Sequence, residues 1–232
     1  MGRTNIMKDL GGYIRDDELK RFIDCIEPLR DRLIFNLLYR TGRRVGEVLK
    51  LKVRDIDFES NKIIWTIEKK NPIKLKRRSR ESDIAFNYRK KTKLINKPLY
   101  QTMKFIDPIC LNLLKQWIEM EKLQAQDYVF KSVNKRNKMF QFRGVAHLSR
   151  FTINGLCRKY GKISGITHIG SKPLHPHHFR HTYAIRKIKR LKTPAEIVKL
   201  RDWLEHSSLD ITQFYLQFRD DEMKDMIDEE VL

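Results

Sequence analysis

The chain has 232 residues, with 49 Lys or Arg against 29 Asp or Glu, so its formal net charge is +20 at pH 7. A chain of this length suits one domain around one core, and a hydrophobic content of 41% excludes wholesale disorder. So large a positive charge favours a polyanionic partner.

Cysteine usage and hydropathy indicate the compartment. The three cysteines form no C-x-x-C pair, which argues against both a disulfide framework and a zinc knuckle. No apolar run approaches the roughly 18–20 residues that span a bilayer, and the N-terminus lacks a signal-peptide core. We therefore expect a soluble, cytoplasmic protein with no membrane partner.

At the N-terminus, residues 1–13 are predicted to form an arm or a linker remnant. Two helices follow it. The first has apolar residues at helical spacing behind Asp16 and Asp17, either of which could serve as the N-cap. The second begins after Pro28, is strongly apolar and ends at Gly42, so it is predicted to be a core helix.

A short helix is predicted over residues 44–51, with Arg44 and Glu47 three positions apart on its outer face. At this spacing the carboxylate could fix the guanidinium for bidentate contact with a phosphate. The pair could equally be an ordinary surface ion pair, worth about a few tenths of a kcal/mol. Spacing alone does not decide between the two interpretations.

Alternating β-branched and aromatic residues predict a strand over residues 61–69. A basic hairpin insertion is predicted after it, over residues 70–96. The interleaved Phe86 and Tyr88, together with the total charge, favour contact with nucleic-acid phosphates over an ordinary solvated charge run. The candidate contact residues are Lys70, Lys74, Lys76, Arg77, Arg78, Arg80, Arg89, Lys90 and Lys91.

Further helices are predicted in the second half of the chain. Asp107, followed by proline, starts a helix whose buried stripe comprises Ile109, Leu113, Leu114, Trp117 and Ile118. Ser149 caps the next helix, which ends at Gly161 and buries Phe151, Ile153, Leu156, Cys157 and Tyr160. A later helix starts at Pro194 and turns inward Ile197, Val198, Leu200, Trp203 and Leu204.

The last predicted elements are a helix from Ser208 and an acidic tail over residues 219–232. The tail keeps apolar residues at helical intervals, so it needs an apolar surface to cover, on its own body or on a neighbour. Together the elements predict a mainly α-helical α+β domain over residues 14–218, with a small antiparallel β-sheet or hairpin.

One set of polar residues stands out. On a helix opening after Pro176, His177 and Arg180 share a face that could hold an anionic group. His206 precedes a Ser-Ser pair able to cap a helix, and Tyr215 lies about two turns into that helix. Each residue alone is more often structural, but a cationic clamp beside a tyrosine hydroxyl suits attack on a phosphodiester.

Other chemistries are disfavoured. His177 and His181 have the spacing of a zinc-binding pair, but no acidic base or third ligand accompanies them, and Arg180 would place positive charge against the ion. We therefore predict no metal site. The phosphate loop G-x-x-x-x-G-K-[ST], the turn G-x-G-x-x-G and the hydrolase elbow G-x-S-x-G are all absent.

Three boxes resemble a known family. They are Thr41-Gly42-Arg43-Arg44-Val45-Gly46-Glu47, His177-x-x-Arg180-His181-Thr182, and Leu204-Glu205-His206-Ser207-Ser208 with Tyr215 nine residues after His206. In order and spacing they are similar to the boxes of the tyrosine recombinase, or phage-integrase-type, catalytic domain. The resemblance runs from about residue 14 to residue 218, nearly the whole chain.

The resemblance implies a catalytic set: Arg44, Lys69, His177, Arg180, His206 and the nucleophile Tyr215. Glu47 then has a supporting role, and Lys70 is a close rival of Lys69 for the general acid. The implied enzyme is a site-specific recombinase that cleaves and rejoins double-stranded DNA through a 3′-phosphotyrosyl intermediate. It uses no cofactor, because the phosphotyrosyl bond conserves the energy of the phosphodiester.

Two alternatives share this clamp: a type IB topoisomerase-like enzyme that relaxes DNA, and a catalytically inactive DNA-binding relative. Family members usually carry an N-terminal core-binding domain, which the residues before Ile14 are too few to form. The sequence therefore predicts either a catalytic fragment or a naturally minimal recombinase. Protomers are expected to associate as dimers or tetramers on DNA, with residues 219–232 as a candidate contact.

Overall fold

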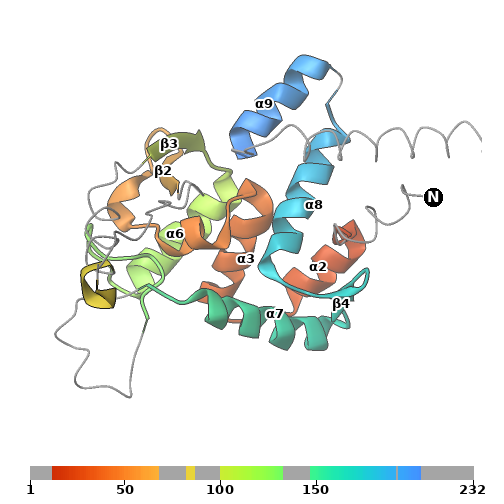
Figure 1. The fold of residues 1–232 in the computed structure, drawn as a ribbon, viewed down its shortest axis with the longest axis horizontal. Coiled ribbons are helices and arrows are strands. Elements are labelled where there is room, and N and C mark those ends of the chain that lie inside the picture. Colours follow the sequence, from red (N-terminus) through yellow and green to blue (C-terminus); the bar gives the residue numbers. More distant parts are fainter. Residues whose placement is uncertain (1–11, 68–81, 87–99, 133–146, 192, 205–232) are drawn as a thin grey trace, which may run out of the picture.

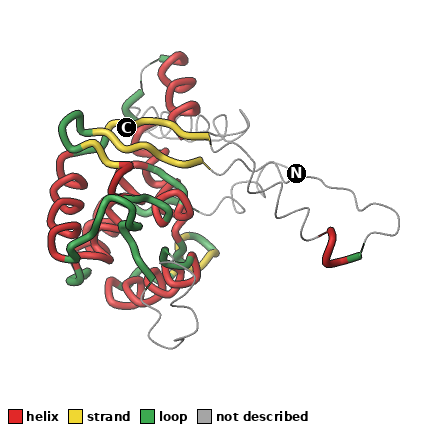
Figure 2. Tube along the Cα trace, turned by 90° about the vertical axis from the view of Figure 1, so that its left-hand side faces the viewer, coloured by secondary structure: helices red, strands yellow, loops and turns green. Residues whose placement is uncertain are grey.

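The computed structural model describes residues 12–67, 82–86, 100–132, 147–191 and 193–204. Within these ranges a body of helices carries a small sheet at one edge (Figures 1 and 2). Helix α3 (Leu29–Thr41) lies at the centre and contacts α2 (Asp16–Asp24), α6 (Pro108–Met120) and α8 (Pro176–Ile188). None of the helices among these residues is both long and apolar enough to cross a lipid bilayer.

The first two helices follow the sequence prediction except at one cap. The N-cap of α2 is Arg15, not Asp16 or Asp17, and its backbone N–H donates to the Glu18 carboxylate at 2.9 Å. The aspartates lie instead in the first turn, where the helix dipole favours negative charge. Helix α3 buries most of its apolar residues and ends at Thr41 with Gly42 as its C-cap, which confirms the predicted end.

The sheet lies between α4 (Val45–Leu49) and α6 in the chain. A 3-10 turn, η1 (Val53–Asp55), leads into β1 (Ile56–Asp57), β2 (Lys62–Ile67) and β3 (Tyr100–Phe105), which pair antiparallel in that order. Strand β2 confirms the predicted strand and buries Ile63, Trp65 and Ile67.

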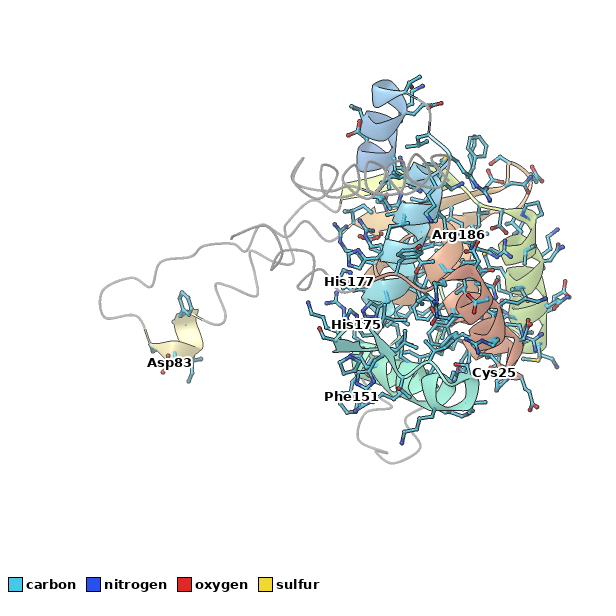
Figure 3. All side chains as sticks on the ribbon, turned by 90° about the vertical axis from the view of Figure 1, so that its right-hand side faces the viewer. Cys25, Asp83, Phe151, His175, His177 and Arg186 are labelled. Carbon is cyan, nitrogen blue, oxygen red and sulfur yellow. The ribbon has the colours of Figure 1, made fainter. Side chains whose placement is uncertain are left out.

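Strands β1 and β3 were not predicted. The apolar residues of β3, Met103 and Phe105, are 53% and 65% exposed, so its alternation does not mark a buried face. Since β2 and β3 pair, the predicted insertion joins two hydrogen-bonded strands. Within that insertion, residues 83–86 are helical, and Figure 3 shows Asp83 well apart from the helical body.

Helices α6 and α7 (Arg150–Ser164) begin at the predicted caps. The side chain of Asp107 accepts the Cys110 N–H at 3.0 Å, and that of Ser149 accepts the Thr152 N–H at 3.1 Å. Their inward faces were partly mispredicted, because Ile109 is 49% exposed and Phe151 is 77% exposed. Spacing fixes a helical face only to within about one residue.

Helix α7 also runs past the predicted stop at Gly161 and ends at Ser164. Gly161 is a packing residue, because an added Cβ would lie 2.7 Å from the Ile166 carbonyl oxygen. After α7, a two-stranded hairpin of β4 (His168–Ile169) and β5 (Lys172–Pro173) leads into α8.

The last described elements are α8 and α9 (Pro194–Leu204), which contact each other; α9 lies at the upper edge of the body in Figure 1. A separate apolar cluster joins them, formed by Tyr183, Ala184, Ile185, Ile188, Leu200 and Leu204. In α9 the prediction holds for Leu200 and Leu204 but is wrong for Val198, which is 43% exposed. The side chain of Ile197 lies outside the described set.

The main core is centred on aromatic rings from four helices. The ring centroids of Phe22 and Phe35 are 4.9 Å apart, and those of Phe35 and Phe179 are 5.0 Å apart. The buried hydroxyl of Tyr160 donates to the Asp31 carboxylate at 2.7 Å, so this polar group in the core is satisfied. The core thus ties α8 to α2, α3 and α7.

The first turn of α8 contains a buried histidine. His178 is fully buried, and its Nδ1 accepts the His175 backbone N–H at 3.1 Å. The proton therefore lies on Nε2, which has no hydrogen-bond partner among the described residues. Burial, and after it the charges of the neighbouring histidines and Lys172, lowers the pKa of His178 to about 3.

Gly42→Ala should strongly destabilise the fold. Gly42 has φ 65°, and an added Cβ would lie 2.5 Å from Tyr183 Cδ1 and 2.9 Å from Leu204 Cδ2. We expect the free energy of unfolding in urea to fall by about 2–4 kcal/mol. The control Gly155→Ala, in α7 with no atom within 4 Å of its Cβ, should raise it by about 0.5–1 kcal/mol. Equal stabilities would contradict this account.

His178 should make stability depend on pH. Because its pKa is lower in the folded state than in the unfolded chain, its neutral form contributes stability that is complete above about pH 6.5 and is lost as pH falls toward 3. Urea unfolding from pH 7.5 to 5 should show this loss. In His178→Gln the slope should shrink by up to about 1.4 kcal/mol per pH unit.

Candidate active site

Arg180 joins three segments that are far apart in the chain. It lies in α8 and is 5% exposed. Its Nη1 donates to the Gly42 carbonyl at 2.6 Å, and its Nη2 donates to the carbonyl of Leu204. These contacts span 138 and 24 residues, and they connect α8 to the loop after α3 and to the end of α9. Each Nη also carries a second N–H.

Arg44 is fixed by Glu47 in two ways. The Arg44 backbone N–H donates to Glu47 Oε2 at 3.0 Å, and Arg44 Nη1 donates to Oε1 at 3.0 Å. The Glu47 side chain is 1% exposed and that of Arg44 is 24% exposed. Glu47 therefore does not lie on an outer face as predicted, and the pair is not an exposed surface ion pair. A buried carboxylate behind a partly exposed guanidinium restricts the direction of that guanidinium.

The two arginines lie in the same part of the molecule. Arg180 is bonded to Gly42, which precedes Arg44 by two residues. Consecutive Cα atoms are ~3.8 Å apart, so the Cα atom of Arg44 lies within ~7.6 Å of that of Gly42. The structure thus brings the first and second boxes together, and the carbonyl of Leu204 brings the start of the third box to them.

Histidines lie at the N-cap and in the first turns of α8. His177 is exposed and lies with His175 at the surface where α8 begins (Figure 3). Its ring centroid is 5.9 Å from that of His181. Burial, and after it the charges of His177 and Arg180, lowers the pKa of His181 to about 4, so this imidazole is neutral near pH 7.

Several predicted site residues lie outside the described residues. They are Lys69, Lys70, His206 and Tyr215, together with Lys74, Lys76, Arg77, Arg78, Arg80, Arg89, Lys90 and Lys91. Two of them directly follow described elements in the chain. Lys69 is two residues beyond the end of β2, and His206 is two residues beyond Leu204. In the part of the chain that is described, no group of three or more His, Cys, Asp or Glu side chains could hold a metal ion.

The sequence analysis assigned no role to Arg43. Its side chain is 1% exposed, and its Nη2 donates to the Trp203 carbonyl at 2.8 Å. Its Cζ lies 5.8 Å from the ring centroid of Trp65. The three-residue spacing to Glu47 and the family resemblance distinguished Arg44 from Arg43 in the sequence, but neither indicated that Arg43 is the buried one.

Comparisons with known proteins point to one family. A family model described as the phage integrase family matches residues 12–222. Tyrosine recombinase XerA of Pyrococcus horikoshii is 26% identical over 225 residues, which cover 96% of this chain and 62% of that protein. Tyrosine recombinase XerC of Staphylococcus aureus is 25% identical over 223 residues, which cover 94% and 60%. The chain therefore spans about 60% of the length of these relatives.

Solved structures show the same fold. A crystal structure of XerA recombinase matches with a TM-score of 0.63 and 23% identity, covering 94% of this chain and 63% of that one. The post-cleavage complex of XerH site-specific recombinase with a palindromic difH substrate matches with a TM-score of 0.64 and 19% identity, covering 97% and 55%. The mainly helical, tyrosine recombinase-like fold predicted from the sequence is confirmed. Because the family model covers nearly the whole chain, the protein belongs to the phage integrase family.

Proposed function

We propose that this chain contains the catalytic domain of a site-specific DNA recombinase, which cleaves and rejoins strands through a 3′-phosphotyrosyl intermediate. The observation that supports this most is the position of Arg180, which is bonded to the loop that carries Arg44 and to the residue two before His206. The relatives named tyrosine recombinases, and the XerH complex with its difH substrate, support the same proposal.

In this proposal the cationic groups bind the scissile phosphate. Arg44, held by Glu47, and Arg180, held by two carbonyls, present N–H donors that need little reorganisation as negative charge develops on the phosphate. Guanidinium suits this role because its donors have a fixed planar geometry and it does not lose its proton in proteins. His206 adds a further donor to the phosphate oxygens.

The remaining groups transfer the strand and the protons. The Tyr215 oxygen attacks phosphorus, a P–O bond to Tyr215 forms, and the P–O bond to the 5′-oxygen breaks. His177 helps to take the tyrosine proton, and Lys69, or its neighbour Lys70, supplies a proton to the departing 5′-oxygen. Attack of a 5′-hydroxyl on the phosphotyrosyl bond reverses each transfer, so the rejoining step balances without ATP.

The other parts of the chain have proposed roles around this centre. The catalytic domain comprises residues 14–218, with residues 1–13 as an arm. The basic insertion over residues 70–96 contacts the DNA backbone, consistent with a net charge of +20. The protein then acts in the cytoplasm, on DNA.

The proposed nucleophile can be tested by trapping. Incubation with a nicked suicide substrate that carries the target site, in EDTA and without ATP, should give a covalent protein–DNA adduct visible on a denaturing gel. Tyr215→Phe should abolish the adduct, because a phenyl ring has no oxygen to attack phosphorus. Tyr128→Phe, which removes a phenol whose ring contacts Lys52 and His147, should keep it. An undiminished adduct in Tyr215→Phe would exclude Tyr215 as the nucleophile.

We also propose that residues 219–232 mediate association of protomers on DNA, because this segment combines apolar residues at helical spacing with net negative charge opposite to the rest of the chain. Deleting residues 220–232 should reduce synapsis of two sites in a gel-shift assay by at least about tenfold, while cleavage of a single suicide substrate persists. The double variant Met223→Ser and Ile227→Ser should reproduce this loss if apolar contact provides the affinity. Normal synapsis by the deletion would refute the proposal.

A further inference from the structure

Arg43 is a buried cation that the chemistry proposed above does not use. It is 1% exposed, in the loop between α3 and α4. Burying a guanidinium is costly unless its donors are satisfied, so such a residue needs a structural explanation. Its contacts include the Trp203 carbonyl, at 2.8 Å from Nη2, and the ring of Trp65, whose centroid is 5.8 Å from Cζ.

The bond to the Trp203 carbonyl holds the end of α9, and the ring of Trp65 in β2 supports the guanidinium. The last carbonyls of a helix lack intrahelical partners and form the negative end of its dipole. In α9, which ends at Leu204, the Trp203 carbonyl accepts from Arg43 and the Leu204 carbonyl accepts from Arg180. Two guanidiniums from different segments thus cap adjacent carbonyls. The indole N–H of Trp203 returns a bond to the Thr41 carbonyl at 3.4 Å.

These bonds connect the 41–44 loop, α8 and the end of α9 to one another. Arg180, in α8, donates to both the loop and α9, and Arg43 donates from the loop to α9. Since the chain reaches His206 two residues after Leu204, the position of the α9 end sets where the third box begins. A displacement of ~1 Å in a reacting group costs ~100-fold in rate.

We infer that Arg43 is a positioning residue, which fixes the C-terminal end of α9 so that the segment carrying His206 and Tyr215 starts at a set point beside Arg180. This inference rests on the proposed function. In this inference Arg43 does not contact DNA, and Arg43 affects the reaction only through the position of the end of α9.

The chemistry of buried charges separates this role from a purely structural one. Replacing a buried ion by an apolar residue of similar volume is often neutral or stabilising for a fold. Methionine is close to arginine in length, packs against aromatic rings and adapts to irregular space. Arg43→Met should therefore preserve the fold near Trp65 while it removes the bond to the Trp203 carbonyl.

The experiment compares Arg43→Met, Arg43→Lys and the control Arg21→Met with the wild-type protein. Arg21 also carries one positive charge, but its side chain is 60% exposed, in α2. Four quantities are measured: the urea midpoint of unfolding, the Kd for target DNA, the single-turnover rate of adduct formation, and hydrogen exchange of the backbone amides of residues 201–204.

We expect Arg43→Met to keep its unfolding midpoint and to bind DNA within about threefold of wild type. Its cleavage rate should fall ~10–100-fold, and amides 201–204 should exchange faster. Arg43→Lys, which keeps the charge on a single ammonium, should recover part of the rate. Arg21→Met should match wild type in all four measurements.

Two results would overturn the inference. One is a cleavage rate in Arg43→Met equal to that of wild type, and the other is a fall in rate that a lower unfolding midpoint fully explains. If wild type itself formed no adduct with its target DNA, the proposed function would fail first. Hydrogen exchange alone would then test whether Arg43 fixes the end of α9, and unchanged exchange of amides 201–204 in Arg43→Met would refute this role.

Discussion

The guanidinium of Arg180 is the contact on which the arrangement of this site depends. Its bonds to the carbonyls of Gly42 and Leu204 connect segments that share no continuous secondary structure. Gly42 permits the first bond, because its left-handed backbone turns the chain sharply between α3 and α4 and leaves room for the ring of Tyr183. The core below, where Phe179 packs against Phe22 and Phe35, fixes the helix from which Arg180 extends.

Much of the fold could be predicted because its signals are local. Asp107 and Ser149 cap their helices through bonds to residues three positions on, and Gly42 ends α3, so each boundary is encoded within a few residues. The wrong predictions concern features that tertiary packing determines. Strand β3 exposes Met103 and Phe105. Gly161 lies inside α7, where a Cβ would meet the Ile166 carbonyl oxygen. A pattern of hydrophobicity reveals neither feature.

The candidate site also has features that the sequence predicts and features that it does not. The bond between Arg44 and Glu47 follows from their three-residue spacing, although their burial does not. The convergence of Gly42, Arg180 and Leu204 bridges up to 138 residues, so no spacing rule contains it; only the combination of boxes indicated it. Arg43 gave no signal at all, because a buried arginine and an exposed arginine look alike in one sequence.

The histidines of α8 show why the arginines dominate the electrostatics of this region. Burial, and after it neighbouring positive charge, lowers the pKa of His178 to about 3 and that of His181 to about 4, so both rings are neutral near pH 7. Neutral imidazoles provide donors and acceptors without repelling the neighbouring cations. The permanent positive charge then resides on guanidiniums, which keep their protons across the physiological range. A phosphate entering this region would therefore meet a guanidinium charge that does not vary with pH across the physiological range.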